Sequence, residues 1–171
     1  MSDTHESRRD DMWDVIETFD FCMLTTHDTI DGEKLMRSRP MASYPDRAAN
    51  RLRFLSKRTD DKVEEVNEAR DVCLNFARPD DNRFVSVSGR ATMTTDRALI
   101  EELWGPAAEI WFGGEPETAD VAVIEVEPVA AEYWKKDETA FTRMAEMAKG
   151  YFTDEPPEIG ENAKVDMERA A

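Results

Sequence analysis

Residues 35–62 constrain the fold more than any other part of this sequence, because strand and turn signals alternate along them before a helix begins. Leu52, Phe54 and Ser56 alternate with Arg51, Arg53 and Leu55, which is the spacing of a half-buried strand. The following residues change to a helical pattern. The segment therefore predicts a strand, a polar turn, a second strand and a turn that leads into a helix.

The rest of the chain repeats these short elements. Residues 21–26 are strand-prone and precede the turn 27–32, whose Asp-Gly pair is a strong hairpin signal, so we expect them to pair with residues 34–44. Gly89 interrupts the strand pattern of residues 84–93 and predicts a bulge or a close backbone approach. Apolar spacing predicts helices over residues 7–19, 59–68, 96–104 and 138–149. Ser7 is the predicted cap of the first of these helices, and Thr94 or Thr95 that of the third. This order predicts an α+β fold, mainly β, in which antiparallel strands surround a small barrel.

The chain length of 171 residues fits one domain with its own core. We assign residues 1–150, including the N-terminal helix, to this domain. Residues 151–171 form an acidic C-terminal tail, for which we expect loose or only partly ordered structure.

The net charge of −16 opposes binding to nucleic acid or to an anionic membrane, since either would repel the chain. No apolar run approaches the roughly 20 residues of a membrane span. The polar, acidic N-terminus resembles neither a secretory signal nor a transit peptide. We expect a cytoplasmic protein with no nucleic-acid or membrane partner.

The cysteines and histidines are too few and too scattered for metal or triad chemistry. Cys22 and Cys73 lie in separate strand-like runs, and the only histidines are His5 and His27. No pair has the spacing of a metal site, so we expect no metal and two free thiols.

A cationic site is nevertheless suggested. Arg37 and Arg39 lie on one predicted strand, and Lys62 lies in the first turn of the helix that Thr59 or Asp60 can cap. These side chains, with the free N–H groups of a helix start, suit a single anion such as a phosphate. Spacing alone favours the simpler interpretation, a hairpin with a solvated basic face.

Five segments, taken together, resemble the general stress protein branch of the pyridoxamine 5′-phosphate oxidase-like FMN-binding proteins. Their order and spacing carry the resemblance, which covers residues 12–134. They are SRPM (38–41), LRFLSKRTDDKVEEV (52–66), DNRFVSVSGRATMTTDRALIEELW (81–104), IWF (110–112) and VEPVAAEYW (126–134).

This resemblance implies a split β-barrel with flanking helices that forms a homodimer, with FMN in grooves between the two subunits. It implies that Arg39, Pro40 and Met41 lie along the flavin ring, with the arginine near the pyrimidine edge. A cation there is one way in which a protein tunes a bound flavin. An aromatic side chain of the partner subunit commonly covers the ring in this family, and Trp111 is the candidate.

The resemblance also implies a phosphate site. Leu55 and Ser56 supply backbone and hydroxyl contacts, Thr59 can supply a second hydroxyl group, and Lys62 reaches the phosphate. Relatives commonly carry serine in this turn, where the present chain has Asp60 and then Asp61. A carboxylate repels a phosphate, so either Lys57 and Arg58 compensate or both aspartates point outward as helix caps.

Two classes of function follow. The first is a flavin-dependent oxidoreductase acting on a small molecule, with a nicotinamide donor or oxygen as its partner, for which the sequence identifies no catalytic side chain. The alternative is a non-catalytic flavin-binding stress or redox-sensing module, and a scaffold that has lost its cofactor is a third option. FAD or a deazaflavin could replace FMN. The tail ENAKVDMERAA lacks the arginine motif of true pyridoxamine 5′-phosphate oxidases, so we do not expect that activity.

Overall fold

The computed structural model describes residues 2–135 and 161–167. Within these residues the helices are α1 (Ser2–Ile16), α2 (Asp61–Glu68), α3 (Arg97–Leu103) and α4 (Pro106–Phe112), with a 3-10 turn η1 (Pro79–Asp81). The strands are β1 (Phe21–Ile30), β2 (Glu33–Ala42), β3 (Tyr44–Asp46), β4 (Arg51–Lys57), β5 (Asp71–Arg78), β6 (Arg83–Thr94), β7 (Val121–Lys135) and β8 (Glu161–Asp166).

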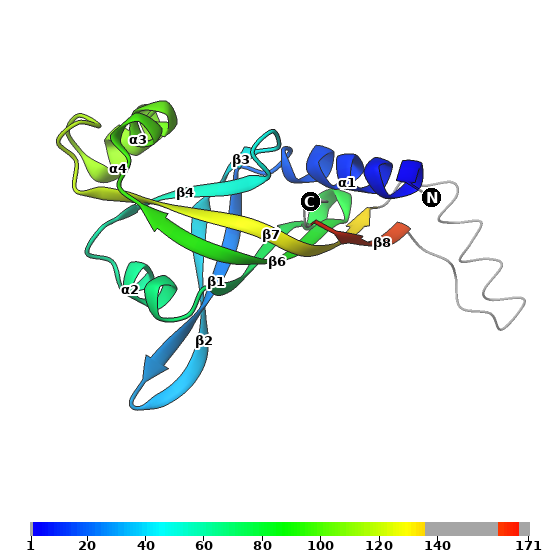
Figure 1. Ribbon diagram of the computed structural model, residues 1–171, viewed down its shortest axis with the longest axis horizontal. Coiled ribbons are helices and arrows are strands. Elements are labelled where there is room, and N and C mark those ends of the chain that lie inside the picture. Colours follow the sequence, from blue (N-terminus) through cyan, green and yellow to red (C-terminus); the bar gives the residue numbers. More distant parts are fainter. Residues whose placement is uncertain (1, 136–160, 168–171) are drawn as a thin grey trace, which may run out of the picture.

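All the strand pairs are antiparallel and belong to one sheet. The strand order is β2-β1-β5-β6-β7-β4-β3, with β8 added beside β7. Figure 1 shows β6 and β7 as the long diagonal of the molecule, with α1 towards one end and α3 and α4 at the other. The β1–β2 hairpin projects from the body beside α2. The predicted mainly-β split barrel with flanking helices is confirmed.

The β1–β2 hairpin turns at Asp31 and Gly32, which have φ angles of 53° and 81°. Two successive positive φ angles make the tight turn that Asp-Gly favours, and Ile30 pairs directly with Glu33. The predicted pairing of the two strands is confirmed. The predicted turn over residues 27–32 was too long, because β1 continues through His27 as far as Ile30.

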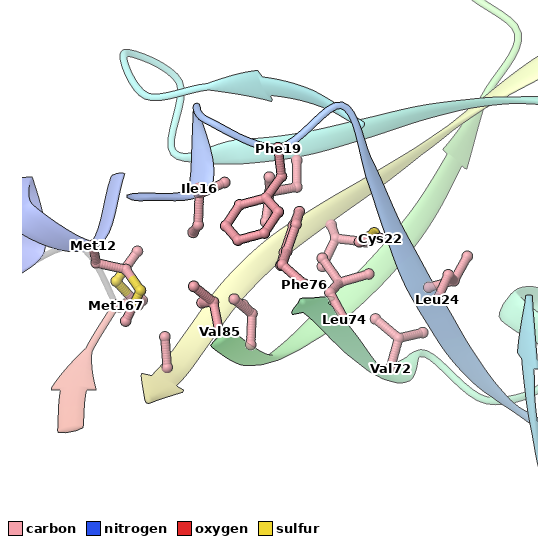
Figure 2. Packing of buried hydrophobic residues seen from close by; sticks show 14 of the residues in the cluster. Met12, Ile16, Phe19, Cys22, Leu24, Val72, Leu74, Phe76, Val85 and Met167 are labelled. Carbon is pink, nitrogen blue, oxygen red and sulfur yellow. The ribbon is translucent and has the colours of Figure 1, made fainter. Parts of the chain in front are cut away.

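The main core lies between α1 and the sheet, as Figure 2 shows. The predicted apolar face of the first helix is buried, and Phe19 packs on Phe76 of β5 with ring centroids 5.5 Å apart. Met12 of α1 lies beside Met167, which follows β8 (Figure 2). The helix begins at Ser2, so the predicted cap at Ser7 was wrong. The helix cap predicted at Thr94 or Thr95 was also wrong, since α3 is capped by Asp96, whose carboxylate accepts from the backbone N–H of Ala98 at 3.0 Å.

Gly89 marks the predicted bulge in β6, because the register with β7 shifts between Ser88 and Gly89. A Cβ atom on Gly89 would stand 2.6 Å from the carbonyl oxygen of Glu127 and 2.7 Å from a methyl group of Val126. Glycine is therefore required by the close approach of the β7 backbone.

Part of the predicted tail belongs to the sheet. Residues 161–166 form β8 on the edge of β7, and Val165 and Met167 are buried in the core. The helix predicted over residues 138–149 lies outside the described residues. The division of the chain at residue 150 stays a prediction.

Candidate functional site

Three elements meet where the predicted anion site should lie. Ser56 is the penultimate residue of β4 and is almost fully buried, and α2 begins five residues later. α2 packs against β1, whose hairpin partner β2 carries Arg39. The fold thus brings Arg39, Ser56 and Lys62 to the first two turns of one helix.

The Ser56 hydroxyl and the Lys62 ammonium group converge on a single oxygen atom. Lys62 Nζ lies 2.5 Å from Oδ2 of Asp60, and Ser56 Oγ donates to the same oxygen at 3.2 Å. Only 13% of the Lys62 side chain is exposed, against 37% of the Asp60 side chain. A hydrogen bond to a charged partner in such a partly buried place is stronger than one in water. These two donors therefore form a small site for one anionic oxygen, and Asp60 fills it.

Asp60 holds the N-cap position of α2, but its side chain makes no capping hydrogen bond. The structure therefore confirms Asp60 as the N-cap residue but not the capping hydrogen bond that was predicted for its side chain. Burial opposes ionisation of the Asp60 carboxyl group, yet its pKa is lowered, because the hydrogen bond and charge of Lys62, with Ser56 and Lys57, favour the carboxylate. Asp60 is thus held as an anion facing Lys62 and does not point outward as a helix cap, and Lys57 is one of the cations that compensate its charge.

Arg39 is bound by a second carboxylate of the same helix. Its Nη1 and Nη2 atoms donate to Oε2 and Oε1 of Glu65 at 2.7 and 2.5 Å, and Nη1 also donates to Thr26 at 3.0 Å. The Thr26 hydroxyl completes the cluster by donating to Glu65 at 2.5 Å. The pKa of Arg39 is raised, first by the hydrogen bond with Glu65, so the guanidinium remains charged. This bidentate pair joins β2 to α2.

Arg37, two residues earlier on β2, makes a looser contact with the same helix. It lies 3.2 Å from Asp28 and 3.7 Å from Asp61, and about half of its side chain is exposed. The first five residues of α2 and its cap thus present three carboxylates, those of Asp60, Asp61 and Glu65, to three cations. The basic side chains predicted to bind an anion are each paired with an acid.

The remaining predicted site residues do not all lie beside Arg39, Ser56 and Lys62. Pro40 and Thr59 are exposed near Arg39 and Lys62 in the sequence, whereas Met41 and Leu55 are buried in two separate core clusters. Trp111 is 76% exposed on α4. In Figure 1, α4 and α2 lie on opposite sides of the end of β4.

Thr26 and Glu65 belong to this cluster but were not predicted as site residues. A signal for Glu65 was present, because this residue directly precedes Val66 on the helix face that buries Val63 and Val66. A carboxylate at the edge of an apolar face needs a cationic partner when it is buried. Arg39 was the available partner in the facing strand.

Two surface hollows are lined by residues other than Arg39, Ser56 and Lys62. A hollow of about 660 Å³ follows β6, β7 and β8, and its lining includes Ser86, Glu132 and Lys164. A second, of about 280 Å³, is lined by His27, Cys73 and Arg90 among others. In residues 2–135 and 161–167, no helix is long and apolar enough to cross a membrane, and no three metal-binding side chains gather.

Comparison with known proteins identifies the family of this chain. Residues 7–158 match the family described as pyridoxamine 5′-phosphate oxidase like. The chain belongs to the pyridoxamine 5′-phosphate oxidase-like family. This membership confirms the family resemblance found in the sequence. Two of the five segments that carried it, residues 38–41 and 52–66, lie in β2 and in β4 to α2.

The chain is similar to protein bli-3 of Neurospora crassa, with 27% identity over 153 residues, which are 85% of this chain and 73% of that protein. A structure from Jannaschia sp. CCS1, named as a general stress protein 26, superimposes with a TM-score of 0.73 at 24% identity over 97% of this chain and 99% of the other. The general stress FMN/FAD binding protein of Xanthomonas citri gives a TM-score of 0.63 at 20% identity over 78% of this chain and 92% of the other. The two structures share the fold with this chain.

Proposed function

We propose that this protein binds FMN where β2, β4 and α2 meet, with the phosphate at Ser56 and Lys62 and the flavin ring along the β2 backbone at Arg39, Pro40 and Met41. The observation that carries the proposal is the convergence of Lys62 Nζ and Ser56 Oγ on one anionic oxygen. This is the arrangement that a phosphate oxygen requires. The Xanthomonas citri structure, a protein named as FMN/FAD binding, supports a flavin rather than another phosphorylated ligand.

The donor set fits an FMN phosphate in charge and in kind. An ammonium group, a hydroxyl group and, close by, a guanidinium group are the side chains that bind phosphates and the carbonyl edges of flavins. Thr59 is exposed at the same turn and adds a second hydroxyl group. FAD could use the same contacts, because its first phosphate has the same position relative to the ring.

We propose further that the active form is a homodimer with the flavin at the subunit interface. The outer face of the sheet exposes Phe21 and Met23 on β1, and Phe84 and Trp134 as cross-strand neighbours on β6 and β7. Large apolar side chains gathered on one face are typical of an interface. A partner subunit would also supply Trp111, whose exposure on α4 leaves its ring free to cover a flavin bound to the other chain.

The bound flavin would supply the oxidation–reduction chemistry itself, with a small-molecule substrate and a nicotinamide or oxygen partner. The residues of this chain orient and enclose it. Arg39, held by Glu65, keeps a fixed positive charge beside the ring, and Lys62 holds the phosphate. No proton transfer by the protein is required for this role.

Flavin fluorescence tests the proposal. Titration of FMN with purified protein should give a saturable quench, which Lys62→Ala weakens by about 10- to 100-fold, the value of a charge-assisted hydrogen bond. Lys34→Ala removes the same charge at the far end of the hairpin and should change the affinity little. Met23→Glu should convert the dimer to a monomer in light scattering and weaken FMN binding with it. Equal effects of Lys62→Ala and Lys34→Ala would contradict the proposed site.

A non-catalytic flavin-binding module that senses redox state is the second candidate. The ionisable side chains at the proposed site, Asp60, Lys62, Arg39 and Glu65, are bound to one another rather than to a free proton donor or acceptor, which favours binding over turnover. Stopped-flow mixing of the loaded protein with NADH or NADPH separates the two. Rapid loss of flavin absorbance supports the enzyme, and slow loss with a redox-dependent melting temperature supports the sensor.

A further inference from the structure

The carboxylate of Asp60 occupies the place assigned to the flavin phosphate. Its Oδ2 atom accepts from both Ser56 Oγ and Lys62 Nζ. A phosphate oxygen that used these two donors would have to lie where the carboxylate oxygen lies. Both groups cannot occupy this position, and their charges repel each other.

We propose that Asp60 is an internal competitor for the cofactor phosphate, which lowers the affinity for FMN and leaves unphosphorylated riboflavin bound nearly as well. This inference rests on the proposed function, because it concerns the same site. It assigns to Asp60 a part in cofactor selection that a serine or threonine in its place could not have.

The geometry favours a carboxylate that competes over one that merely lies nearby. The Asp60 side chain makes no capping hydrogen bond to the backbone of α2, and its carboxylate instead binds the Ser56 hydroxyl and the Lys62 ammonium group. The contact is only partly buried, with 37% of the Asp60 side chain exposed. The carboxylate can therefore rotate into solvent when a stronger anion arrives, at the cost of its bond to Lys62.

Asp61 provides a matched control in the adjacent position. It carries the same charge, but its side chain is 79% exposed and its nearest described cation is Arg37 of β2 at 3.7 Å. A change that acts through the overall charge of the turn would affect Asp60 and Asp61 alike. A change that acts through the two donors would affect Asp60 alone.

The test compares FMN and riboflavin on the wild type, Asp60→Asn and Asp61→Asn. For the wild type we expect dissociation constants within about tenfold of each other. Asp60→Asn should bind FMN roughly 10- to 100-fold more tightly and riboflavin unchanged, since one charge-assisted hydrogen bond is released for the phosphate. Asp61→Asn should change neither by more than about threefold, because exposed charges are screened. An equal gain for both ligands, no gain for FMN, or an equal effect of Asp61→Asn would overturn the proposal.

A second readout needs no flavin. Inorganic phosphate should raise the melting temperature of Asp60→Asn and of Asp60→Ser more than that of the wild type, and Lys62→Ala added to either variant should abolish the rise. The serine variant keeps a hydroxyl partner for Lys62, so it covers the case in which asparagine impairs folding. If phosphate stabilises the variants while no flavin binds, the competition stands and the flavin function fails. If flavins bind but phosphate and substitution have no selective effect, the flavin function stands and the competition fails.

Discussion

The guanidinium group of Arg39 and the carboxylate of Glu65 form a bidentate ion pair that joins β2 to α2, with the Thr26 hydroxyl bound to both. The two side chains are 18% and 7% exposed, so the pair is shielded from water. It orients the arginine that the proposed cofactor needs and also fixes the helix that carries Lys62. Structure and site thus depend on the same contact.

Replacing Glu65 by glutamine should destabilise the fold by about 2–4 kcal/mol, because the charge of Arg39 is then left without its partner in a largely buried place. Asp61→Asn is the control, since it removes the same charge from a pair that is mostly exposed and should cost less than about 1 kcal/mol. Urea denaturation followed by circular dichroism measures both. Similar small losses for the two variants would show that the Arg39–Glu65 pair contributes little.

Gly89→Ala should cost about 2–3 kcal/mol, because the new methyl group meets the β7 backbone at 2.6 Å and backbone cannot move aside as a side chain can. Gly105→Ala is the matched variant. It introduces the same methyl group with no neighbouring atom within 4 Å, at an extended φ of −148°, and should cost at most about 1 kcal/mol at this helix cap. Equal melting temperatures of the two variants would contradict the close approach at the bulge.

Met167→Ala should destabilise the protein by about 2–5 kcal/mol, the usual cost of truncating a fully buried methionine. Lys164→Ala, on the exposed face of β8, should have an effect within about 0.5 kcal/mol. Thermal unfolding of both variants tests whether this part of the acidic tail belongs to the core. A neutral Met167→Ala would mean that β8 contributes nothing to stability.

Cys22 should resist thiol reagents in the native protein. Burial, with a smaller effect of Cys73, raises the pKa of Cys22 from 9.0 to about 12, so the reactive thiolate is absent at pH 9 in the folded state and abundant there in the unfolded state. In a Cys73→Ser variant, Ellman's reagent at that pH should detect no thiol before denaturant is added and one afterwards. Rapid reaction of the native variant would show that Cys22 is accessible.

Sequence patterns predicted the strands and turns around the site well, because each depends on local rules. The Asp31-Gly32 turn, the bulge at Gly89 and the apolar face of α2 all follow from residues that are close in sequence. The sequence patterns located the ends of helices and strands less accurately. α1 starts at Ser2, five residues before the predicted cap at Ser7, and β1 extends beyond the predicted turn.

The pairing of the charges could not be predicted, because it depends on tertiary contacts between segments far apart. Arg39 and Glu65 are 26 residues apart and meet only because α2 packs against the β1–β2 hairpin. Spacing also could not decide whether Asp60 would cap the helix or turn to Lys62, since both partners are within reach of a short side chain. β8 was missed for a similar reason, as its short strand gains its stability from β7 and α1 rather than from its own sequence.

Flavin titration of the purified wild-type protein tests the central claim most directly. We expect FMN to bind with one flavin per chain and a dissociation constant at or below about 10 μM, together with a shifted visible absorption spectrum. Saturable binding that is lost in Lys62→Ala and retained in Lys34→Ala would support a cofactor site where β2, β4 and α2 meet, with the phosphate at Ser56 and Lys62. A protein that binds neither FMN, FAD nor riboflavin at millimolar concentration would contradict the account.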